Sequence, residues 1–136
     1  MTAKEYLKQA KWIEVRIYIK QQQLQNIREL STSVNAMLSG MPSGTRDVHS
    51  QEKLLAKIVD LEAEIKTEFK RLVDVKNDIN EKLNRMQNND YKLLLGLRYI
   101  CNERWDDICQ KLCYSKRSVY RHHGLALKEF EKILHE

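Results

Sequence analysis

The sequence predicts an all-helical fold with few loops. Its 136 residues include only four Gly and one Pro, whereas a sheet protein of this size needs a turn about every 8–12 residues. The chain is rich in Leu, Lys, Glu, Gln and Arg, which lose little side-chain freedom in a helix. This length corresponds to one small domain or slightly more. The composition therefore argues against all-β and doubly wound α/β folds.

The first predicted element is a long helix that ends at a cluster of Gly, Pro and Ser. This cluster, at residues 39–45, predicts a loop that we place at about 39–49. Before it, apolar residues recur three or four positions apart, as on one face of a helix, with polar interruptions at Lys20 and Ser31. The stripe contains Tyr6, Ala10, Ile13, Ile17, Leu24, Ile27, Val34 and Leu38.

The second predicted element is a long helix with a heptad repeat. Five apolar residues that lie seven positions apart indicate a coiled-coil-like seam. They are Ile58, Ile65, Leu72, Ile79 and Met86, and the companion row holds Leu54, Leu61 and Val75 with polar Glu68 and Lys82. Opposite charges four residues apart support the helix on its flanks. These pairs are Glu62 with Lys66, Asp78 with Lys82, and Glu81 with Arg85.

Two long helices joined by a short polar loop predict an antiparallel hairpin over residues 1–87. Each helix would be about 50–55 Å long. A lone pair of helices buries only a thin seam, and tertiary packing supplies most of the stability of a helix. Leu55, Phe69 and Leu83 widen the apolar stripe of the second helix. We therefore expect a homodimer with four helices, and the alternative is that the C-terminal module packs back on the hairpin.

A module boundary is expected near residue 88, where the heptad pattern ends. Asn89 or Asp90 is the expected N-cap of the next helix. Residues 88–136 then predict three helices at 91–100, 105–112 and from a Ser115 cap to 134, with a tight turn at 113–114. Their inward residues are Leu94, Leu95, Leu97, Ile100, Trp105, Ile108, Cys109, Leu112, Val119, Leu125 or Ala126, Leu127, Phe130, Ile133 and Leu134.

The last two of these helices predict a helix-turn-helix. A short turn joins them, and the second begins with Ser and is rich in basic residues. The stretches YKLLLGLRYI at 91–100, WDDIC at 105–109 and YSKRSVYR at 114–121 resemble region 4 of sigma-70 factors, which reads promoter DNA. Two positions depart from that pattern, because Cys113 replaces the usual turn Gly and Arg104 replaces a Ser or Thr cap.

The whole chain also resembles small phage and prophage proteins of Gram-positive bacteria that are similar to ArpU-like and RinA-like late transcription regulators. The opening MTAKEYL and the Met41-Pro42 loop are similar to that family. The resemblance implies a transcription regulator in the bacterial cytoplasm with double-stranded DNA as its partner, and it leaves open whether RNA polymerase is a second partner. No apolar run reaches the roughly 20 residues of a membrane span, and three Cys residues without a pairing framework predict reduced thiols in an intracellular protein.

Region 4 inserts the first half of its last helix into the major groove. Carried over to this chain, the resemblance places Lys116, Arg117, Tyr120 and Arg121 in the groove and Ser118 near DNA. The full expected DNA-binding set is Ser115, Lys116, Arg117, Ser118, Tyr120, Arg121 and His122. Protonation of His122 and His123 would add attraction to phosphate below about pH 6.5.

Charge placement agrees with this assignment independently of the resemblance. The chain carries 24 Lys and Arg against 19 Asp and Glu, a net charge of +5 that an ordinary soluble surface can also show. Residues 115–125 contain three cations and no acid, whereas the rest of 88–136 contains six cations and seven acids. The alternative for these three cations is a solvated helix face without a ligand.

Two function classes follow. The first is a sequence-specific DNA-binding regulator of phage or prophage genes. The second is an interaction module whose hairpin binds a protein partner, such as RNA polymerase or a phage packaging assembly. We expect no enzyme activity and no cofactor, because the sequence has no phosphate-binding Gly-rich loop, no HExxH and no nucleophile with a positioned base. Cys109, Cys113 and His122 lack the C-x-x-C spacing of zinc sites, so we expect no metal.

Overall fold

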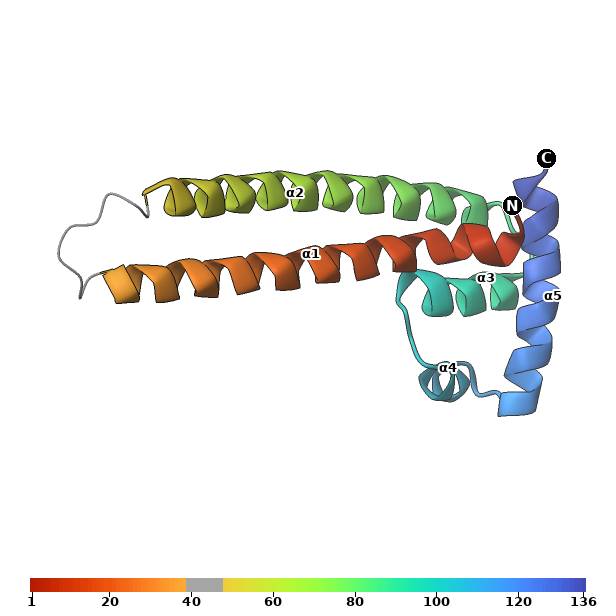
Figure 1. The fold of residues 1–136 in the computed structure, drawn as a ribbon. Coiled ribbons are helices and arrows are strands. Elements are labelled where there is room, and N and C mark those ends of the chain that lie inside the picture. Colours follow the sequence, from red (N-terminus) through yellow and green to blue (C-terminus); the bar gives the residue numbers. More distant parts are fainter. Residues whose placement is uncertain (39–47) are drawn as a thin grey trace. The chain divides into compact units, whose positions relative to one another are not determined.

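The computed structural model describes residues 1–38 and 48–136, with side chains described at 1–33 and 49–136. The described residues are all helical apart from short connections and ends, which confirms the all-α prediction. Most of the expected loop at 39–49 lies outside the described residues, and its last two residues already belong to a helix. The elements are α1 (Ala3–Leu38), α2 (Val48–Asn84), α3 (Asn89–Leu95), the π-helical turn η2 (Gly96–Ile100), α4 (Trp105–Leu112) and α5 (Lys116–Leu134) (Figure 1).

The chain forms two compact units, and the long helices contribute to both. Residues Glu14–Arg71 form the first, which we call the hairpin unit. Residues Met1–Ile13 and Leu72–Glu136 form the second, the C-terminal unit. The start of α1 and the end of α2 thus belong with residues 88–136, so this grouping does not divide the chain at residue 88.

In the hairpin unit, α1 and α2 run antiparallel and are joined by ion pairs (Figure 1). Arg16 lies 3.2 Å from Glu68, and Lys20 lies 3.0 Å from Glu64. Further along, Arg28 pairs with Glu62. Moving forward along α1 therefore means moving backward along α2. Opposite charges on facing flanks favour this register over a slipped one, although each exposed pair contributes only about 0–1 kcal/mol.

The charged interruptions of the predicted stripes have partners in the structure. Glu68 is buried, and its carboxylate contacts Arg16 on the other helix and Arg71 at 3.4 Å on its own. Two guanidinium groups compensate the cost of removing this carboxylate from water. Lys20 likewise reaches out of the seam to Glu64. These residues connect the two helices while keeping their charged atoms paired.

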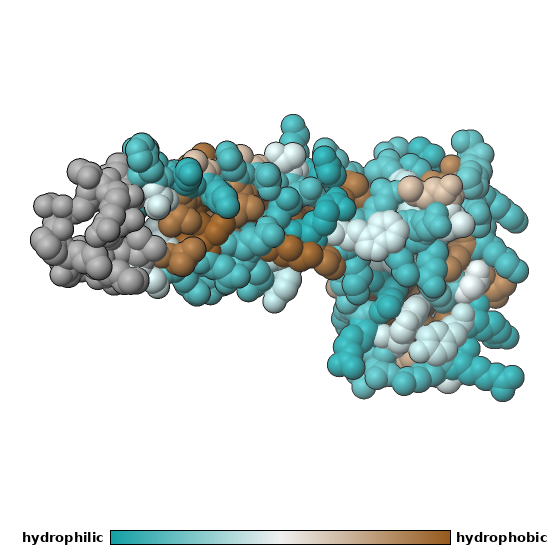
Figure 2. All heavy atoms as spheres, in the orientation of Figure 1, coloured by the Kyte–Doolittle hydropathy of each residue, from teal (hydrophilic) through white to brown (hydrophobic). Residues whose placement is uncertain are grey.

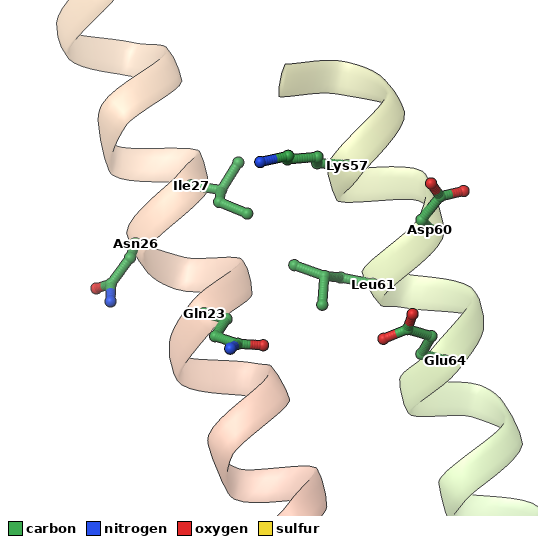
Figure 3. Close-up of a pocket in the computed structure, with 7 residues that line it drawn as sticks. All are labelled: Gln23, Asn26, Ile27, Lys57, Asp60, Leu61 and Glu64. Carbon is green, nitrogen blue, oxygen red and sulfur yellow. The ribbon is translucent and has the colours of Figure 1, made fainter. Parts of the chain in front are cut away.

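The apolar seam of the hairpin unit is only partly covered. Ile17 and Leu24 are buried, whereas Leu61 and Ile65 are half-buried. Figure 3 shows the side chains of Ile27 and Leu61 pointing toward each other between the helices, in a hollow that is otherwise lined by polar residues. Two helices alone cannot enclose these side chains, so one side of the seam stays open to solvent.

Two residues that were expected to widen the stripe of α2 lie outside its covered face. Leu55 is 62% exposed and Phe69 is 45% exposed, because both lie one position away from the seam row, which rotates them by about 100°. Leu83, the third residue of this prediction, is buried in the C-terminal unit. The expected positions of Val34 and Leu38 concern side chains outside the described residues.

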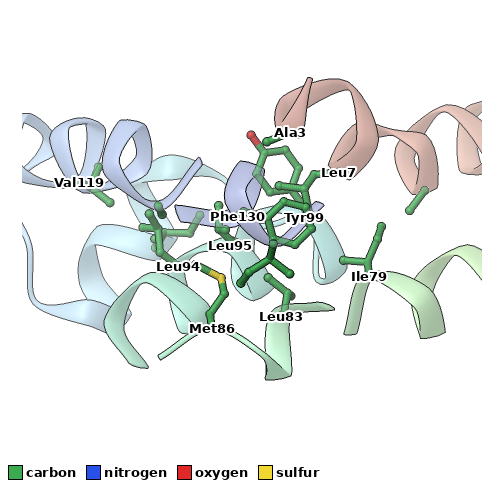
Figure 4. Packing of buried hydrophobic residues seen from close by; sticks show 14 residues of the cluster. Ala3, Leu7, Ile79, Leu83, Met86, Leu94, Leu95, Tyr99, Val119 and Phe130 are labelled. Atoms are coloured by element: carbon green, nitrogen blue, oxygen red, sulfur yellow. The ribbon is translucent and has the colours of Figure 1, made fainter. Parts of the chain in front are cut away.

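The C-terminal unit holds the main hydrophobic core of the described residues. The start of α1, the end of α2 and the helices α3, η2, α4 and α5 all contribute to it (Figure 4). Its largest fully buried side chains are Leu7, Ile79, Leu94, Leu95, Ile108, Val119 and Phe130. Ala3 and Leu7 also belong to this core. The apolar stripe predicted for the first helix began at Tyr6 and did not include them.

Helix α3 begins at Asn89, two residues before the expected start at 91. Its N-cap is Asn88, whose side-chain oxygen accepts hydrogen bonds from the backbone N–H groups of Asp90 and Tyr91. The expected caps Asn89 and Asp90 are therefore wrong, because they already lie in the first helical turn. The helix then widens into the π turn η2, which shifts the residues after Gly96 around the helix axis. This turn ends at Ile100, and Asn102 follows it with a left-handed backbone at φ 55°.

Helix α5 packs against α3 and α4 through one face (Figure 1). Of the two alternatives for its inward row, Ala126 is correct, since it is fully buried and Leu125 is 43% exposed. The small side chain of Ala126 lets the helix approach its neighbours closely. The buried residues of α5 are Val119, Ala126, Phe130 and Ile133, and they define this inward face.

Candidate nucleic-acid interface

Helices α4 and α5 are joined by a tight turn at residues 113–115. Cys113 is in the left-handed region with φ 58° and ψ 40°, and the backbone N–H of Tyr114 donates to the carbonyl oxygen of Cys109 at 3.0 Å. Ser115 then caps α5, with its hydroxyl oxygen accepting from the backbone N–H of Ser118 at 3.2 Å. Both helices begin and end where the sequence analysis expected them. Arg104 precedes α4 without a side-chain cap, as its residue type predicts.

The first two turns of α5 present one exposed face. Lys116, Arg117, Tyr120 and Arg121 are all exposed, and their spacing of one, three and four residues places them on the same side of the helix. Buried Val119 lies on the other side and anchors the helix in the core. The structure thus brings these four expected residues together on a surface that carries three cations and one phenol.

The remaining expected residues lie at the edges of this face. Ser115 is exposed, but its hydroxyl caps the helix. Ser118 is half-buried, with its hydroxyl 3.3 Å from Nδ1 of His122. Both serines therefore have structural partners in the free chain.

His122 supports the turn before α5. Its ring stacks on Tyr114 with centroids 4.7 Å apart and planes inclined by 5°. Its Nδ1 lies 2.8 Å from the carbonyl oxygen of Ser118, to which a protonated Nδ1 would donate. Burial, followed by the neighbouring Asp90, raises the pKa of the Tyr114 hydroxyl. These contacts hold His122 on the flank of α5, beside the exposed face.

His123 contradicts the expectation that it gains charge near pH 6.5. Its ring is half-buried and packs edge-on against Trp105, with centroids 4.7 Å apart. Burial, followed by the positive charges of Lys4 and Arg98, lowers the pKa of His123 to about 4. The imidazole therefore stays neutral over the physiological range, and it adds no attraction for phosphate there.

One ion pair links α4 to the exposed face of α5. The ammonium of Lys116 lies 2.9 Å from a carboxylate oxygen of Asp106, and both side chains are largely exposed. The hydrogen bond from Lys116 lowers the pKa of Asp106, and the same bond raises the pKa of Lys116. Lys116 is therefore paired in the free chain, and a ligand that takes up this ammonium must compete with Asp106.

A further pair of basic residues lies beside this face. Arg98, from η2, places its guanidinium 4.6 Å from the centroid of the Trp105 ring, and Tyr120 packs against the same ring at 5.3 Å. Arg104 precedes α4 and is exposed. Together they line an open hollow whose full set of residues is Arg98, Arg104, Trp105, Asp106, Lys116 and Tyr120.

Arg98 and Arg104 were not among the residues that the sequence predicted to bind a ligand. Arg98 precedes Trp105 by seven residues and lies in a different element, so no local pattern shows that the two side chains meet. The chain path through the π turn and the left-handed Asn102 brings them together. The only sequence signal was that Arg98 lies in the stretch at 91–100 that resembles region 4, whereas Arg104 lies just before the stretch at 105–109.

The described residues carry no further sign of a bound ion or of a membrane segment. In residues 1–38 and 48–136, no three His, Cys, Asp or Glu side chains are grouped as a metal ion would require. Across the same ranges, every helix is too short or too polar to cross a membrane.

Fold and surface together define an all-helical protein with a cationic helix face displayed beside a tight turn. The family of proteins of unknown function DUF1492 matches residues 30–131 of this chain. The match covers more than half of the sequence, so the chain belongs to this family. No curated protein matches the chain significantly. No solved structure does so either.

Proposed function

We propose that this protein is a sequence-specific DNA-binding regulator of phage or prophage transcription. In this proposal α4 and α5 form a helix-turn-helix, and α5 enters the major groove of promoter or operator DNA. Arg117 and Arg121 read base edges, because a guanidinium can donate two hydrogen bonds to guanine O6 and N7. Lys116 binds a phosphate, and Tyr120 contacts the groove beside these residues.

The exposed cationic face of α5 is the observation that carries this proposal. A solvated surface helix usually mixes both signs of charge, whereas residues 115–125 carry three cations and no acid. These three cations are exposed on a helix whose opposite face is fixed in the core by Val119 and Ala126. A rigid helix with a free basic side is what insertion into a DNA groove requires.

Selection of bound sequences from a random pool of duplex DNA tests the proposal. The parent protein should enrich a defined sequence, and the triple variant Lys116→Ala, Arg117→Ala and Arg121→Ala should enrich none. A matched control replaces Lys128 and Lys132, which are exposed on later turns of α5, by Ala. This control should enrich the parent sequence. Equal enrichment by the parent and the triple variant would exclude α5 as the reading helix.

The oligomeric state follows from the same selection. A dimer of this protein would present two copies of α5, and two-fold symmetry would then select a palindrome. Half-sites with centres about 34 Å apart, or a multiple of this distance, would indicate two reading helices on one side of the duplex. A single asymmetric site would indicate that one copy binds.

A second candidate function is an interaction module without sequence-specific DNA binding. The exposed apolar side chains of the hairpin unit favour it: Val15, Tyr18, Ile19, Leu30, Leu55, Val59 and Phe69 are each 45% exposed or more. Figure 2 shows apolar surface along the two long helices. Exposed apolar surface of this kind is typical of protein interfaces. The partner would be RNA polymerase, a phage packaging assembly or a second copy of this chain.

The salt dependence of DNA binding distinguishes the two functions. A sequence-reading protein retains a preference for its site at salt concentrations that abolish binding to random DNA. An interaction module with a basic surface would bind all duplexes with equal affinity, and its affinity for all of them would fall in parallel as the salt concentration rises.

A further inference from the structure

The hollow beside α5 is lined by three cationic and two aromatic side chains. Arg98, Arg104 and Lys116 line it together with Trp105 and Tyr120, and Asp106 is its only acid. The formal charge of this set is three positive against one negative. The hollow opens to solvent at the start of α4 and α5. It lies next to the exposed face of α5 and shares Lys116 and Tyr120 with that face.

Arg98 is held in place before any ligand arrives. Its guanidinium lies 4.6 Å from the centroid of the Trp105 ring, and its Nη1 donates to the backbone carbonyl of Glu103 at 2.9 Å. A guanidinium has five N–H donors, so most of them stay available for another acceptor. A positioned guanidinium next to further cations is well suited to the oxygens of a phosphate group.

Asp106 is the residue of the hollow whose negative charge repels an anion. Its carboxylate binds the ammonium of Lys116 at 2.9 Å. An anion that enters must displace the Asp106 carboxylate from this ammonium or remain beside its negative charge. Removal of the acid alone should therefore strengthen anion binding, which gives a test whose sign is opposite to that of removing a cation.

We propose that this hollow binds one backbone phosphate of the DNA duplex that α5 reads. Arg98 and Arg104 donate to its oxygens, and Lys116 exchanges Asp106 for the phosphate. The contact fixes the register of α5 without reading sequence, as phosphate contacts do. A phosphate of the duplex, and not a free anion, is the occupant because the hollow adjoins the face that would enter the groove. This inference rests on the proposed function.

Arg104→Gln is the sharpest variant, because Arg104 is exposed and its loss should leave the fold intact. Its affinity for the selected duplex should fall, and the slope of log affinity against log salt should flatten by about one. The ratio of specific to random binding should stay at the parent value. Arg98→Lys keeps the positive charge but loses the fork of donors, so its affinity should fall while its salt slope stays near the parent value.

Two further variants complete the set. Asp106→Asn should bind all duplexes more tightly than the parent, by a similar factor for specific and random DNA. Lys132→Gln, on the last turn of α5, removes an exposed cation outside the hollow and should leave the salt slope unchanged. Arg117→Ala serves as the reference for a residue that reads bases, with a reduced ratio of specific to random binding.

The indole N–H resonance of Trp105 reports on the hollow directly, and Trp12, the other Trp of the chain, serves as the control resonance. Duplex DNA should shift the Trp105 signal. Inorganic phosphate should shift it no more than chloride at the same ionic strength. A shift by inorganic phosphate but not by DNA would assign the hollow to a free anion and overturn the proposal.

The outcomes separate this inference from the proposed function. If Arg104→Gln binds DNA with the parent affinity and slope while Arg117→Ala loses specificity, the hollow does not hold a phosphate and α5 still reads DNA. If the parent binds no duplex with any preference, the proposed function fails, and the duplex as occupant of the hollow fails with it.

Discussion

The Nε2 atom of His123 lies 2.7 Å from the hydroxyl oxygen of Tyr99. The two rings also stack, with centroids 5.8 Å apart and planes inclined by 25°. Tyr99 belongs to the π turn η2, and its pKa is raised, mainly by burial. A neutral His123 with an unprotonated Nε2 can accept a hydrogen bond from the phenol, and this contact ties the middle of α5 to the element that carries Arg98. The protonation state of His123 therefore bears on the stability of the candidate interface.

Acidification should destabilise this protein through His123. The pKa of His123 is about 4 in the folded chain against an ordinary value of 6.5. Between these values the unfolded chain binds a proton that the folded chain does not, so the free energy of unfolding rises with pH. The contribution is complete above about pH 6.5 and is lost as the pH falls toward 4. Urea unfolding at a series of pH values should show this loss, and a proton NMR titration should give the His123 midpoint near 4.

His123→Gln provides the comparison. Glutamine does not titrate in this range, so the difference in unfolding free energy between parent and variant should shrink as the pH falls from 6.5 to 4. A constant difference across this range, or a His123 midpoint close to 6.5, would contradict a buried and neutral imidazole.

Replacing Cys113 by Gly should stabilise the turn before α5. Cys113 adopts φ 58°, where a residue with a Cβ is strained by about 1–2 kcal/mol relative to Gly. Glycine also increases the freedom of the unfolded chain, which offsets part of the gain. We expect a net increase of up to about 1 kcal/mol in the free energy of unfolding, measured by chemical denaturation. Cys113→Val should be destabilising, since a β-branched residue tolerates this conformation poorly. A Gly variant less stable than the parent would argue against the left-handed turn.

Phe130 and Leu125 should differ sharply in their importance for stability. Phe130 is fully buried, with its ring centroid 5.9 Å from that of Tyr6, whereas Leu125 on the same helix is 43% exposed. Phe130→Ala should cost about 3–5 kcal/mol, because it removes buried apolar surface and leaves a cavity. Leu125→Ala should stay within about 0.5 kcal/mol of the parent. Thermal unfolding followed by circular dichroism compares them, and equal costs would mean that the inward face of α5 is assigned to the wrong row.

The basic residues of α5 should separate into two kinds. Arg117→Ala and Arg121→Ala should each weaken binding to the selected duplex by about 1–3 kcal/mol and reduce its preference over random DNA. Lys116→Ala should weaken binding to all duplexes and flatten the salt dependence. Fluorescence anisotropy with labelled duplexes at several salt concentrations measures both quantities. A uniform loss for all three variants would show that α5 contacts only phosphate.

The hairpin unit should mediate self-association. Leu55 and Val59 are 62% and 58% exposed and lie one turn apart on α2. The double variant Leu55→Glu and Val59→Glu should dissociate a dimer without unfolding the chain, because neither side chain is buried in the single copy. Sedimentation equilibrium at micromolar concentration tests this, with Gln25→Glu as an exposed control. A parent protein that sediments as a monomer would remove the dimer.

Local patterns determined the elements of this fold. The scarcity of Gly and Pro predicted helices, and the sequence around Ser115 predicted the turn, the cap and the bounds of α4 and α5. These features depend on interactions within a few residues of the chain, such as the hydrogen bond from Ser118 to Ser115. The pattern of charge in residues 115–125 likewise identified the exposed face, because the helical period alone places Arg117 and Arg121 on one side.

Tertiary structure alone decided which polar residues have partners that are distant in sequence and which cations converge. Glu68 looked like an interruption of the seam, and it pairs with Arg16, 52 residues earlier. His123 looked like a surface histidine, and burial against Trp105 and Tyr99 keeps it neutral. Arg98 and Lys116 border one hollow although they come from different helices. Periodicity reports the direction of a side chain within its own helix, whereas burial and pairing depend on neighbours that are distant in sequence, and only the folded chain brings them together.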